Sequence, residues 1–449
     1  MTKDMTKGNL LKILVSFSIP LILSGLLQQL YSWADAFIVG NIEGEQALAA
    51  IGATNVITGL FIMAIIGFAS GVSILSARRF GEGDRAVQSR LLSSFALVLG
   101  CAALVLMAVG IRYSRPFLLL LKTPGDIIDI AQNYLQIILV GLPFLTIYNV
   151  YGAVLRGIGD SKAPFYAVLL SSVANIILDI VFVGLLRWRA EGAAVATVVS
   201  QVLMTVFIIG YAAKKYEMLR FRLGRSVLDF AVLGEGSRLA LPITFQSVVT
   251  SGGNLILQNF MNSFGTATVA AITTAYRIDS MILLPVFNLA TGITTVTSQN
   301  FGAKEYRRVH KCLRVGVGLT ALVSVGLTGI VLLCGSPLIR LFGVTEEAVT
   351  IGADFFRAIA WFYIVFGSAM AMRGYVEGLG KVVFSGLCGI ATLALRIILS
   401  YVMKPYLGNM SIAWAEAVAW CFQLLAYLVF ILLVVRPGQK KEEKSVLQS

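Results

Sequence analysis

The sequence predicts an all-α integral membrane protein with twelve transmembrane helices in two pseudo-symmetric lobes of six. Only 13% of its 449 residues are charged and 57% are hydrophobic, whereas about 25% of residues are charged in soluble globular proteins. The apolar residues gather in segments long enough to cross ~30 Å of hydrocarbon as helices. The chain also repeats itself with an offset of about 221 residues. These three observations exclude a soluble globular domain.

Twelve apolar segments are the predicted helices. The first follows a short Lys-containing head and is too long for the core of a signal peptide, so we interpret it as a retained helix. The segments are residues 11–39, 48–77, 91–113, 127–155, 163–186, 192–213, 236–262, 267–299, 312–334, 351–372, 382–403 and 410–435.

The net charge of +13 arises in alternate connections between helices, which favours a membrane topology over nucleic-acid binding. Basic residues concentrate in cytoplasmic loops of inner-membrane proteins. We therefore expect a multi-pass inner-membrane protein with both termini cytoplasmic. The basic positions are Arg78, Arg79, Arg85 and Arg90, then Lys214, Lys215, Arg220, Arg222, Arg225 and Arg238, then Lys304, Arg307, Arg308, Lys311 and Arg314, and in the tail Arg436, Lys440, Lys441 and Lys444.

Residues for enzymatic or metal chemistry are scarce. The five cysteines are scattered without a CxxC pair, and the only histidine, His310, lies in a basic loop. A structural metal site or a Ser-His-Asp arrangement has almost nothing to be built from. We expect neither an enzyme nor a resident cofactor.

The repeat divides the chain into equivalent halves. Gly71 aligns with Gly292, Phe80-Gly81 with Phe301-Gly302, and Pro20 with Pro242 after one gap. Six helices per half is an even number, so both copies enter the membrane in the same direction, as in transporters that work by rocking. The expected domains are an N-terminal lobe (1–213), a basic cytoplasmic linker (214–234) and a C-terminal lobe with a basic tail (235–449).

Several motifs resemble the multidrug and toxic compound extrusion (MATE) family. They are Pro20 with Asp35-Ala-Phe-Ile-Val-Gly40, Ala47-Leu-Ala-Ala-Ile-Gly52, Ala77-Arg-Arg-Phe-Gly81, Leu155-Arg-Gly-Ile-Gly-Asp160 and Asn175-Ile-Ile-Leu-Asp179. The resemblance implies two lobes forming a V and an antiporter that exports amphipathic compounds against H⁺ or Na⁺. One branch of the family carries extra acids in the first and fourth helices of the second lobe. The corresponding stretches here, residues 247–253 and 361–372, have none, which resembles the branch named for the DNA-damage-inducible protein F.

Two carboxylates, Asp35 and Asp179, lie inside apolar segments without a basic neighbour in sequence. A charge in the bilayer core costs at least about 2.5–3.5 kcal/mol, so such residues usually serve a function. Helical rise places both, with Asn175 and Thr197, at similar depth in the first lobe. The four oxygen-bearing side chains suit Na⁺, or the two carboxyls share a proton, and the resemblance implies a coupling-ion site at matching positions.

Each residue taken alone has a structural alternative. Asp35 is near enough to a helix end to reach the interface, and Asp179 is explicable as a structural hydrogen-bonding residue. Thr197 and Asn175 are each explicable as polar packing residues. Only the cluster predicts a site.

Other candidate residues are weaker. Pro20 is a candidate hinge because a membrane proline frees a carbonyl and permits bending; the alternative is a static kink. The second lobe carries a candidate polar site formed by Arg277, Asp279 and Arg396. A structural role for these residues is equally open. Aromatic and methionine side chains are suited to binding flat cations, although packing against lipid is the commoner role of such residues. The candidates for the substrate cavity are Tyr31, Tyr134, Tyr148, Tyr151, Met281 and Phe287.

The predicted function is therefore multidrug efflux in exchange for H⁺ or Na⁺, by a monomer whose partners are small amphipathic molecules and the lipid bilayer. The alternative is a lipid-linked oligosaccharide flippase of the same superfamily. Its cavity needs Arg or Lys to bind pyrophosphate, whereas the first lobe presents acids. A membrane enzyme or receptor has no paired catalytic groups or signalling domain to support it.

Overall fold

The computed structural model describes residues 4–221 and 228–435. This part of the chain forms two compact units. Unit 1 comprises Ile19–Thr244, and unit 2 joins Asp4–Ser18 to the chain from Phe245 onward. Some predicted basic residues fall outside the described residues, namely Lys3, Arg222, Arg225 and the tail residues Arg436, Lys440, Lys441 and Lys444.

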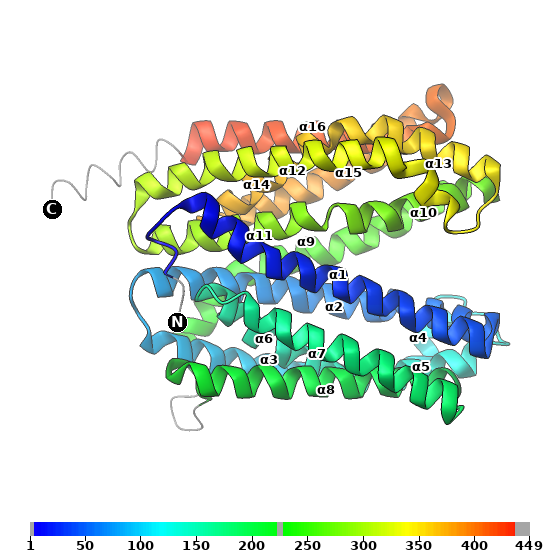
Figure 1. Cartoon of the computed structure of the whole chain (residues 1–449), viewed down its shortest axis with the longest axis horizontal. Helices are drawn as coiled ribbons and strands as arrows, with labels where there is room; N and C mark the ends of the chain where they lie inside the picture. Colours follow the sequence, from blue (N-terminus) through cyan, green and yellow to red (C-terminus); the bar gives the residue numbers. More distant parts are fainter. Residues whose placement is uncertain (1–3, 222–227, 436–449) are drawn as a thin grey trace. The chain divides into compact units, whose positions relative to one another are not determined.

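Unit 1 is a bundle of helices that run alongside one another (Figure 1). Its core lies where α6 packs against α2, α3 and α8, and α7 packs on α8. The helices are α1 (Leu10–Glu43), α2 (Glu45–Gly81), α3 (Ala86–Arg112), α4 (Ser114–Leu120), α5 (Ile128–Val140), α6 (Leu142–Gly157), α7 (Lys162–Asp179), the π-helix η1 (Ile180–Leu185), α8 (Arg189–Lys215) and the short 3₁₀ helix η2 (Glu217–Leu219).

Unit 2 is built around α14, which packs against α11, α12 and α16. α15 packs along α16, and α10 packs on α13. The helices are α9 (Phe230–Asn262), α10 (Thr266–Ile282), α11 (Leu284–Gly302), α12 (Tyr306–Arg340), α13 (Glu346–Ile359), η3 (Ala360–Phe362), α14 (Tyr363–Gly378), α15 (Val382–Leu407), η4 (Gly408–Met410), α16 (Ser411–Phe430) and the π-helix η5 (Ile431–Val435).

The all-helical membrane fold is confirmed, and each of the twelve predicted segments is helical. By length and composition, eight helical stretches are able to span a membrane, or up to ten if each bent pair is one span. The number is below twelve for two reasons. Val382–Val435 counts as one stretch although it covers two predicted segments, and polar residues dilute the apolar residues of α9.

Two of the spanning segments bend at a proline. α5 and α6 meet at an angle of 41°, as do α10 and α11, and α6 and α11 carry Pro143 and Pro285 in their first turns. Proline removes a helical N–H and its ring clashes with the preceding turn. Ala64 occupies the place in α2 that the repeat offset gives for Pro285. α2 accordingly runs unbroken, so the two halves differ at this point.

The paired glycines of the repeat have a packing reason. A Cβ on Gly71 of α2 would lie 2.3 Å from the Cα of Ala240, and one on Gly292 of α11 would lie 2.6 Å from Ser18 Oγ. Both distances are shorter than any van der Waals contact. Gly71 therefore admits the first half of α9 into unit 1, and Gly292 admits the start of α1 into unit 2.

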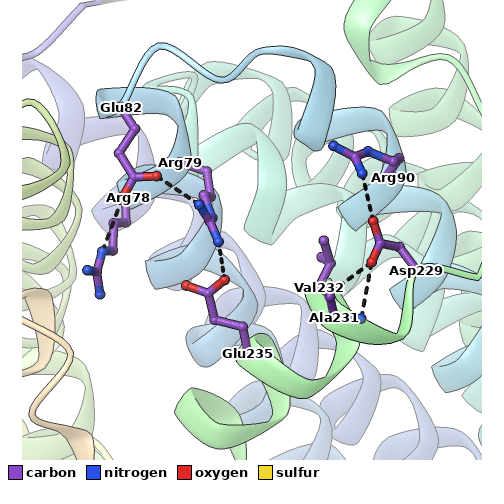
Figure 2. A network of polar contacts seen from close by, with 8 residues as sticks. All are labelled: Arg78, Arg79, Glu82, Arg90, Asp229, Ala231, Val232 and Glu235. Carbon is purple, nitrogen blue, oxygen red and sulfur yellow. Dashed lines mark hydrogen bonds and ion pairs between the residues drawn. The ribbon is translucent and has the colours of Figure 1, made fainter.

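Ion pairs hold the beginning of α9 to unit 1 (Figure 2). Arg90 Nη1 lies 2.8 Å from Asp229 Oδ2, and Asp229 Oδ1 accepts hydrogen bonds from the N–H groups of Ala231 and Val232. Arg79 at the end of α2 pairs with Glu235. These side chains are partly exposed, so each pair contributes little alone; the network fixes where α9 begins.

Hydrogen bonds hold the beginning of α1 to unit 2 in a comparable way. The buried Gln299 accepts a hydrogen bond from the N–H of Met5, and the buried Asn300 donates a hydrogen bond to the carbonyl of Met5. Arg308 donates to Asn300 Oδ1 and to the carbonyl of Gly8. The division between the units then falls within α1 and α9, beside Pro20 and Pro242 respectively.

We expect Gly71→Val to destabilise unit 1, because the added carbons overlap the backbone of α9. Overpacking of this kind costs about 1–3 kcal/mol or more. Thermal unfolding of the purified protein in detergent measures the loss. Gly59→Val on the same helix is the control, since a Cβ there meets nothing within 4 Å. Equal melting temperatures for the two variants would contradict this packing.

Candidate functional site

The two membrane carboxylates of unit 1 have buried oxygen atoms without a hydrogen-bond donor among the described residues. Asp179 is fully buried, and neither of its carboxyl oxygens has a hydrogen-bond partner within the described residues. Asp35, in the second half of α1, is half-buried, and its Oδ1 is likewise unpartnered within them. The two carboxyls lie within electrostatic range of each other. The buried oxygens of both carboxyl groups are therefore shielded from water.

Asp179 also lies at an irregularity of the helix. It is the last residue of α7, directly before the π-helix Ile180–Leu185. Segments of π-helix are rare and are frequent at functional sites. The wider turn that begins here lets a polar side chain take a direction that a regular α-helix would not give it.

A polar stripe extends along α7 from Asp179. Asn175 and Ser172 precede it by four and seven residues and share its face. Both are buried, and Asn175 Oδ1 and Ser172 Oγ have no partner among the described residues. Asn175 Nδ2 makes a long contact of 3.5 Å with Thr197 Oγ1 of α8. α7 and α8 thus bring three of the four predicted coupling residues together, and Asp35 comes from α1.

Of the predicted aromatic residues, Tyr134 and Tyr31 lie within electrostatic range of the acids, Tyr31 of Asp35 alone. Tyr134 is 6% exposed, packs with Val39 of α1 and Val183 of η1, and is within electrostatic range of Asp35 and Asp179. Tyr31 lies within range of Tyr134. Tyr148 and Tyr151 are buried in the main core of unit 1 instead.

The largely apolar cavity of unit 1 lies elsewhere. It has a volume of about 160 Å³ and is lined by α2, α3 and α6, with Thr244 at its edge. Its wall includes Phe61, Phe68 and Asn149, and none of the predicted aromatic or methionine residues. In unit 2, Met281 is half-buried, and Phe287, at 42% exposure, packs edge-on against Phe366.

Unit 2 separates the residues of its predicted polar site. Arg277 is exposed, whereas Asp279 is 6% exposed and accepts a hydrogen bond from Tyr363. Arg396 Nη2 donates to Glu416 Oε2 at 2.9 Å and to Tyr276 Oη at 2.7 Å. Asp279 and Arg396 are therefore close, and Arg277 belongs to the surface.

Sequence reasoning missed four polar residues that the fold adds to these clusters. Glu416 was detectable as a charge within an apolar segment, and Ser172 by its helical spacing from Asn175 and Asp179. No sequence pattern indicated Tyr276 and Tyr363, because the residues to which they hydrogen-bond lie on other helices. Among the described residues, no three His, Cys, Asp or Glu side chains are grouped as a metal site.

Asp160, at the end of the RGIGD motif, connects helices through hydrogen bonds. Its Oδ2 accepts hydrogen bonds from Tyr216 (2.6 Å) and Lys215 (3.1 Å), and its Oδ1 accepts from the N–H groups of Lys162 and Ala163 at the start of α7. Burial opposes ionisation, but the bonds from Tyr216 and Lys215 outweigh it and lower the pKa of Asp160. The motif therefore ties the α6–α7 turn to the end of α8.

Comparison with known proteins agrees with this architecture. The MatE family model matches residues 20–181 and 242–402, once in each half. The chain is 28% identical to the probable multidrug resistance protein YpnP of Bacillus subtilis, over 92% of this chain and 90% of that protein. It is 22% identical to the multidrug export protein MepA of Staphylococcus aureus, over 95% of each. A solved structure of an outward-facing multidrug resistance MATE family transporter superposes with a TM-score of 0.89 at 21% identity, covering 100% of this chain and 99% of that one.

The fold and the two matched repeats define a multi-pass membrane transporter rather than an enzyme. The chain belongs to the MatE family. The two matches, beginning at Pro20 and Pro242, confirm the internal repeat and its offset of about 221 residues.

We expect Asp160→Asn to lower the melting temperature at neutral pH, by the equivalent of about 1–3 kcal/mol for a buried acceptor that loses charged and hydroxyl donors. Since the folded pKa is depressed, the ionised carboxyl stabilises the protein above the unfolded pKa of about 3.9. That stability is lost as the pH falls through the folded pKa. Melting curves of both proteins should converge in acid; a constant difference across pH would contradict the assignment.

Proposed function

We propose that this protein is a secondary active multidrug efflux antiporter, which exports amphipathic and cationic compounds in exchange for H⁺ or Na⁺. The supporting observation is the pair Asp35 and Asp179, buried acceptors of unit 1 with no donor among the described residues. Buried ionisable groups in membrane segments are costly and usually mark ion pathways. The curated relatives in Bacillus subtilis and Staphylococcus aureus carry names of multidrug resistance or export.

The pair couples ion and substrate through a difference in free energy between conformations. In the outward-facing state the carboxyls take up the ion, which disfavours a cationic substrate nearby. Release of the ion on the inner side restores two negative charges and substrate affinity. Because each ligand changes the affinity of the other by the same factor, a gradient of one drives the other.

Both ions suit the groups present. A proton needs only one oxygen, and two carboxyls in electrostatic range favour sharing one. Na⁺ needs several oxygen ligands, which Asp35 and Asp179 supply with Asn175 Oδ1, Thr197 Oγ1 and Ser172 Oγ. We propose these five residues as the ion-coupling site, with Tyr134 beside it.

The apolar cavity of unit 1 suits the flat, apolar part of such compounds. Its volume of about 160 Å³ is close to that of cavities of roughly 150 Å³ that stay dry and bind benzene. Asn149 adds a polar group to its wall. Tyr31, Tyr148, Tyr151, Met281 and Phe287 remain proposed substrate contacts for other stages of transport.

The remaining assignments follow from sequence. We propose an inner-membrane monomer with cytoplasmic termini that binds no nucleic acid, and functional lobes at 1–213 and 235–449. The absence of acids from residues 247–253 and 361–372 of the second half supports affinity with the DNA-damage-inducible protein F branch. The flippase alternative lacks support, since the coupling site presents carboxylates rather than Arg or Lys.

Asp35→Asn is expected to reduce export to background, because the amide neither binds a proton nor carries charge. The measurement is ethidium efflux and drug resistance in cells that contain equal amounts of each variant. Asp126→Asn, at an exposed position, is the matched control and should export normally. Resistance at the wild-type level in the Asp35 variant would refute the proposal.

Pro20→Ala is expected to slow export while leaving the melting temperature unchanged or raised, because alanine straightens α1 and restores a helical hydrogen bond. Pro242→Ala tests the equivalent position of α9. Initial rates of ethidium efflux at matched protein amounts are the measurement. Normal rates in both variants would show that the kinks are static.

A further inference from the structure

Unit 2 contains a buried polar cluster that the coupling site of unit 1 does not use. Asp279 of α10 accepts a hydrogen bond from Tyr363 of α14. Beside it, Arg396 of α15 pairs with Glu416 of α16, and Tyr276 donates to Glu416 Oε2 at 3.0 Å. Arg396 and Glu416 both lie within electrostatic range of Asp279.

The charges of this cluster do not balance. Two carboxylates face a single guanidinium, and all three side chains are largely buried. The other charges on elements packed against α10 do not help. In α13, Asp354 and Arg357 pair with each other at the surface and Glu347 is exposed, and Arg340 of α12 pairs with the exposed Glu346. The remaining basic residues of α12 lie at its opposite end, within residues 306–314, and α11 has no charged residue. With Glu416 matched by Arg396, the negative charge left on Asp279 is compensated only by a tyrosine hydroxyl. An unpaired buried charge is strongly unfavourable.

A proton is the ligand that this geometry fits. A metal cation needs several oxygen ligands, and the guanidinium of Arg396 repels one. A proton needs only a single carboxyl oxygen. We propose that the carboxyl of Asp279 is a second proton-binding site of this protein and takes up one proton in unit 2. Tyr363 and the Arg396–Glu416 pair surround this carboxyl.

The position of Asp279 connects proton binding to helix geometry. It lies four residues before Leu283, where α10 and α11 bend by 41°. Tyr363 begins α14 directly after the 3₁₀ interruption Ala360–Phe362. The hydrogen bond thus joins two broken helices, and interrupted helices form the ion sites of many transporters. Unit 1 has Thr58 at the position equivalent to Asp279, so this site is particular to the second half.

The site is tested by infrared difference spectroscopy between about pH 5 and about pH 9, the range in which buried carboxyls titrate. The parent protein carries Asn in place of both Asp35 and Asp179, so that the carboxyls of the unit 1 site contribute no band. We expect this parent protein to show the C=O band of a protonated carboxyl that disappears at alkaline pH. Asp279→Asn should lack that band, whereas Asp354→Asn, which alters an exposed carboxyl of the same unit, should keep it.

Charge balance supplies a second variant, which keeps the test valid if Asp279→Asn misfolds. Glu416→Gln leaves one carboxylate and one guanidinium, so Asp279 should stay ionised and the band should vanish although Asp279 is intact. A purely structural cluster would give a band that is constant across this pH range or absent throughout it. Persistence of the titrating band in Asp279→Asn would also overturn the proposal.

Coupling of this proton to export rests on the proposed function, but the spectra do not. An antiporter without this site would show proton-driven ethidium flux and no Asp279 band. A proton site without antiport would show the band and no flux. The two failures are therefore distinguishable. We expect Asp279→Asn to exchange about one proton fewer per cycle, measured as proton uptake with an indicator dye in weak buffer.

Discussion

The low dielectric of the membrane interior is the constraint on which this structure depends. Hydrocarbon offers backbone and charged groups no hydrogen bonds, so every spanning segment is helical and nearly every charge lies in a loop or a pair. Arg396–Glu416 and Arg373–Glu377 follow the rule inside unit 2. Asp35 and Asp179 break it, since no donor among the described residues meets their buried oxygens. Because buried charges of this kind are unfavourable, they usually mark functional sites, which is the basis of the proposed coupling site.

The two repeated halves share the packing that holds the beginnings of α1 and α9, and they differ in the partners of their buried acids. In each unit a glycine admits the beginning of a helix that continues into the other unit, Gly71 for α9 and Gly292 for α1. Polar contacts fix these beginnings on both sides. The acids, however, are placed differently. Asp179 of unit 1 has no hydrogen-bond partner among the described residues, whereas Asp279 of unit 2 lies beside Tyr363 and the Arg396–Glu416 ion pair. We propose on this basis that unit 1 couples the ion and that Asp279 of unit 2 binds a proton beside the bend between α10 and α11.

The sequence predicted much of the fold because each helix is long enough to be recognised from its own apolar residues. The repeat also followed from glycines and aromatics at a constant offset. Contacts between helices were harder to predict. The spacing of Asn175 and Asp179 placed them on one face, but nothing local indicated that Tyr363 would meet Asp279. The bend after Ile282 and the π-helix after Asp179 likewise depend on packing around prolines and polar groups, which hydropathy does not report.

The central claim is that a carboxyl pair in unit 1 couples an ion gradient to export. Its most direct test is ethidium flux in proteoliposomes under a pH gradient and a Na⁺ gradient applied separately. The account predicts flux driven by at least one gradient, lost when Asp35 is replaced by Asn, and the effective gradient identifies the ion. Absence of flux under both gradients, or unchanged flux without the Asp35 carboxyl, would contradict it.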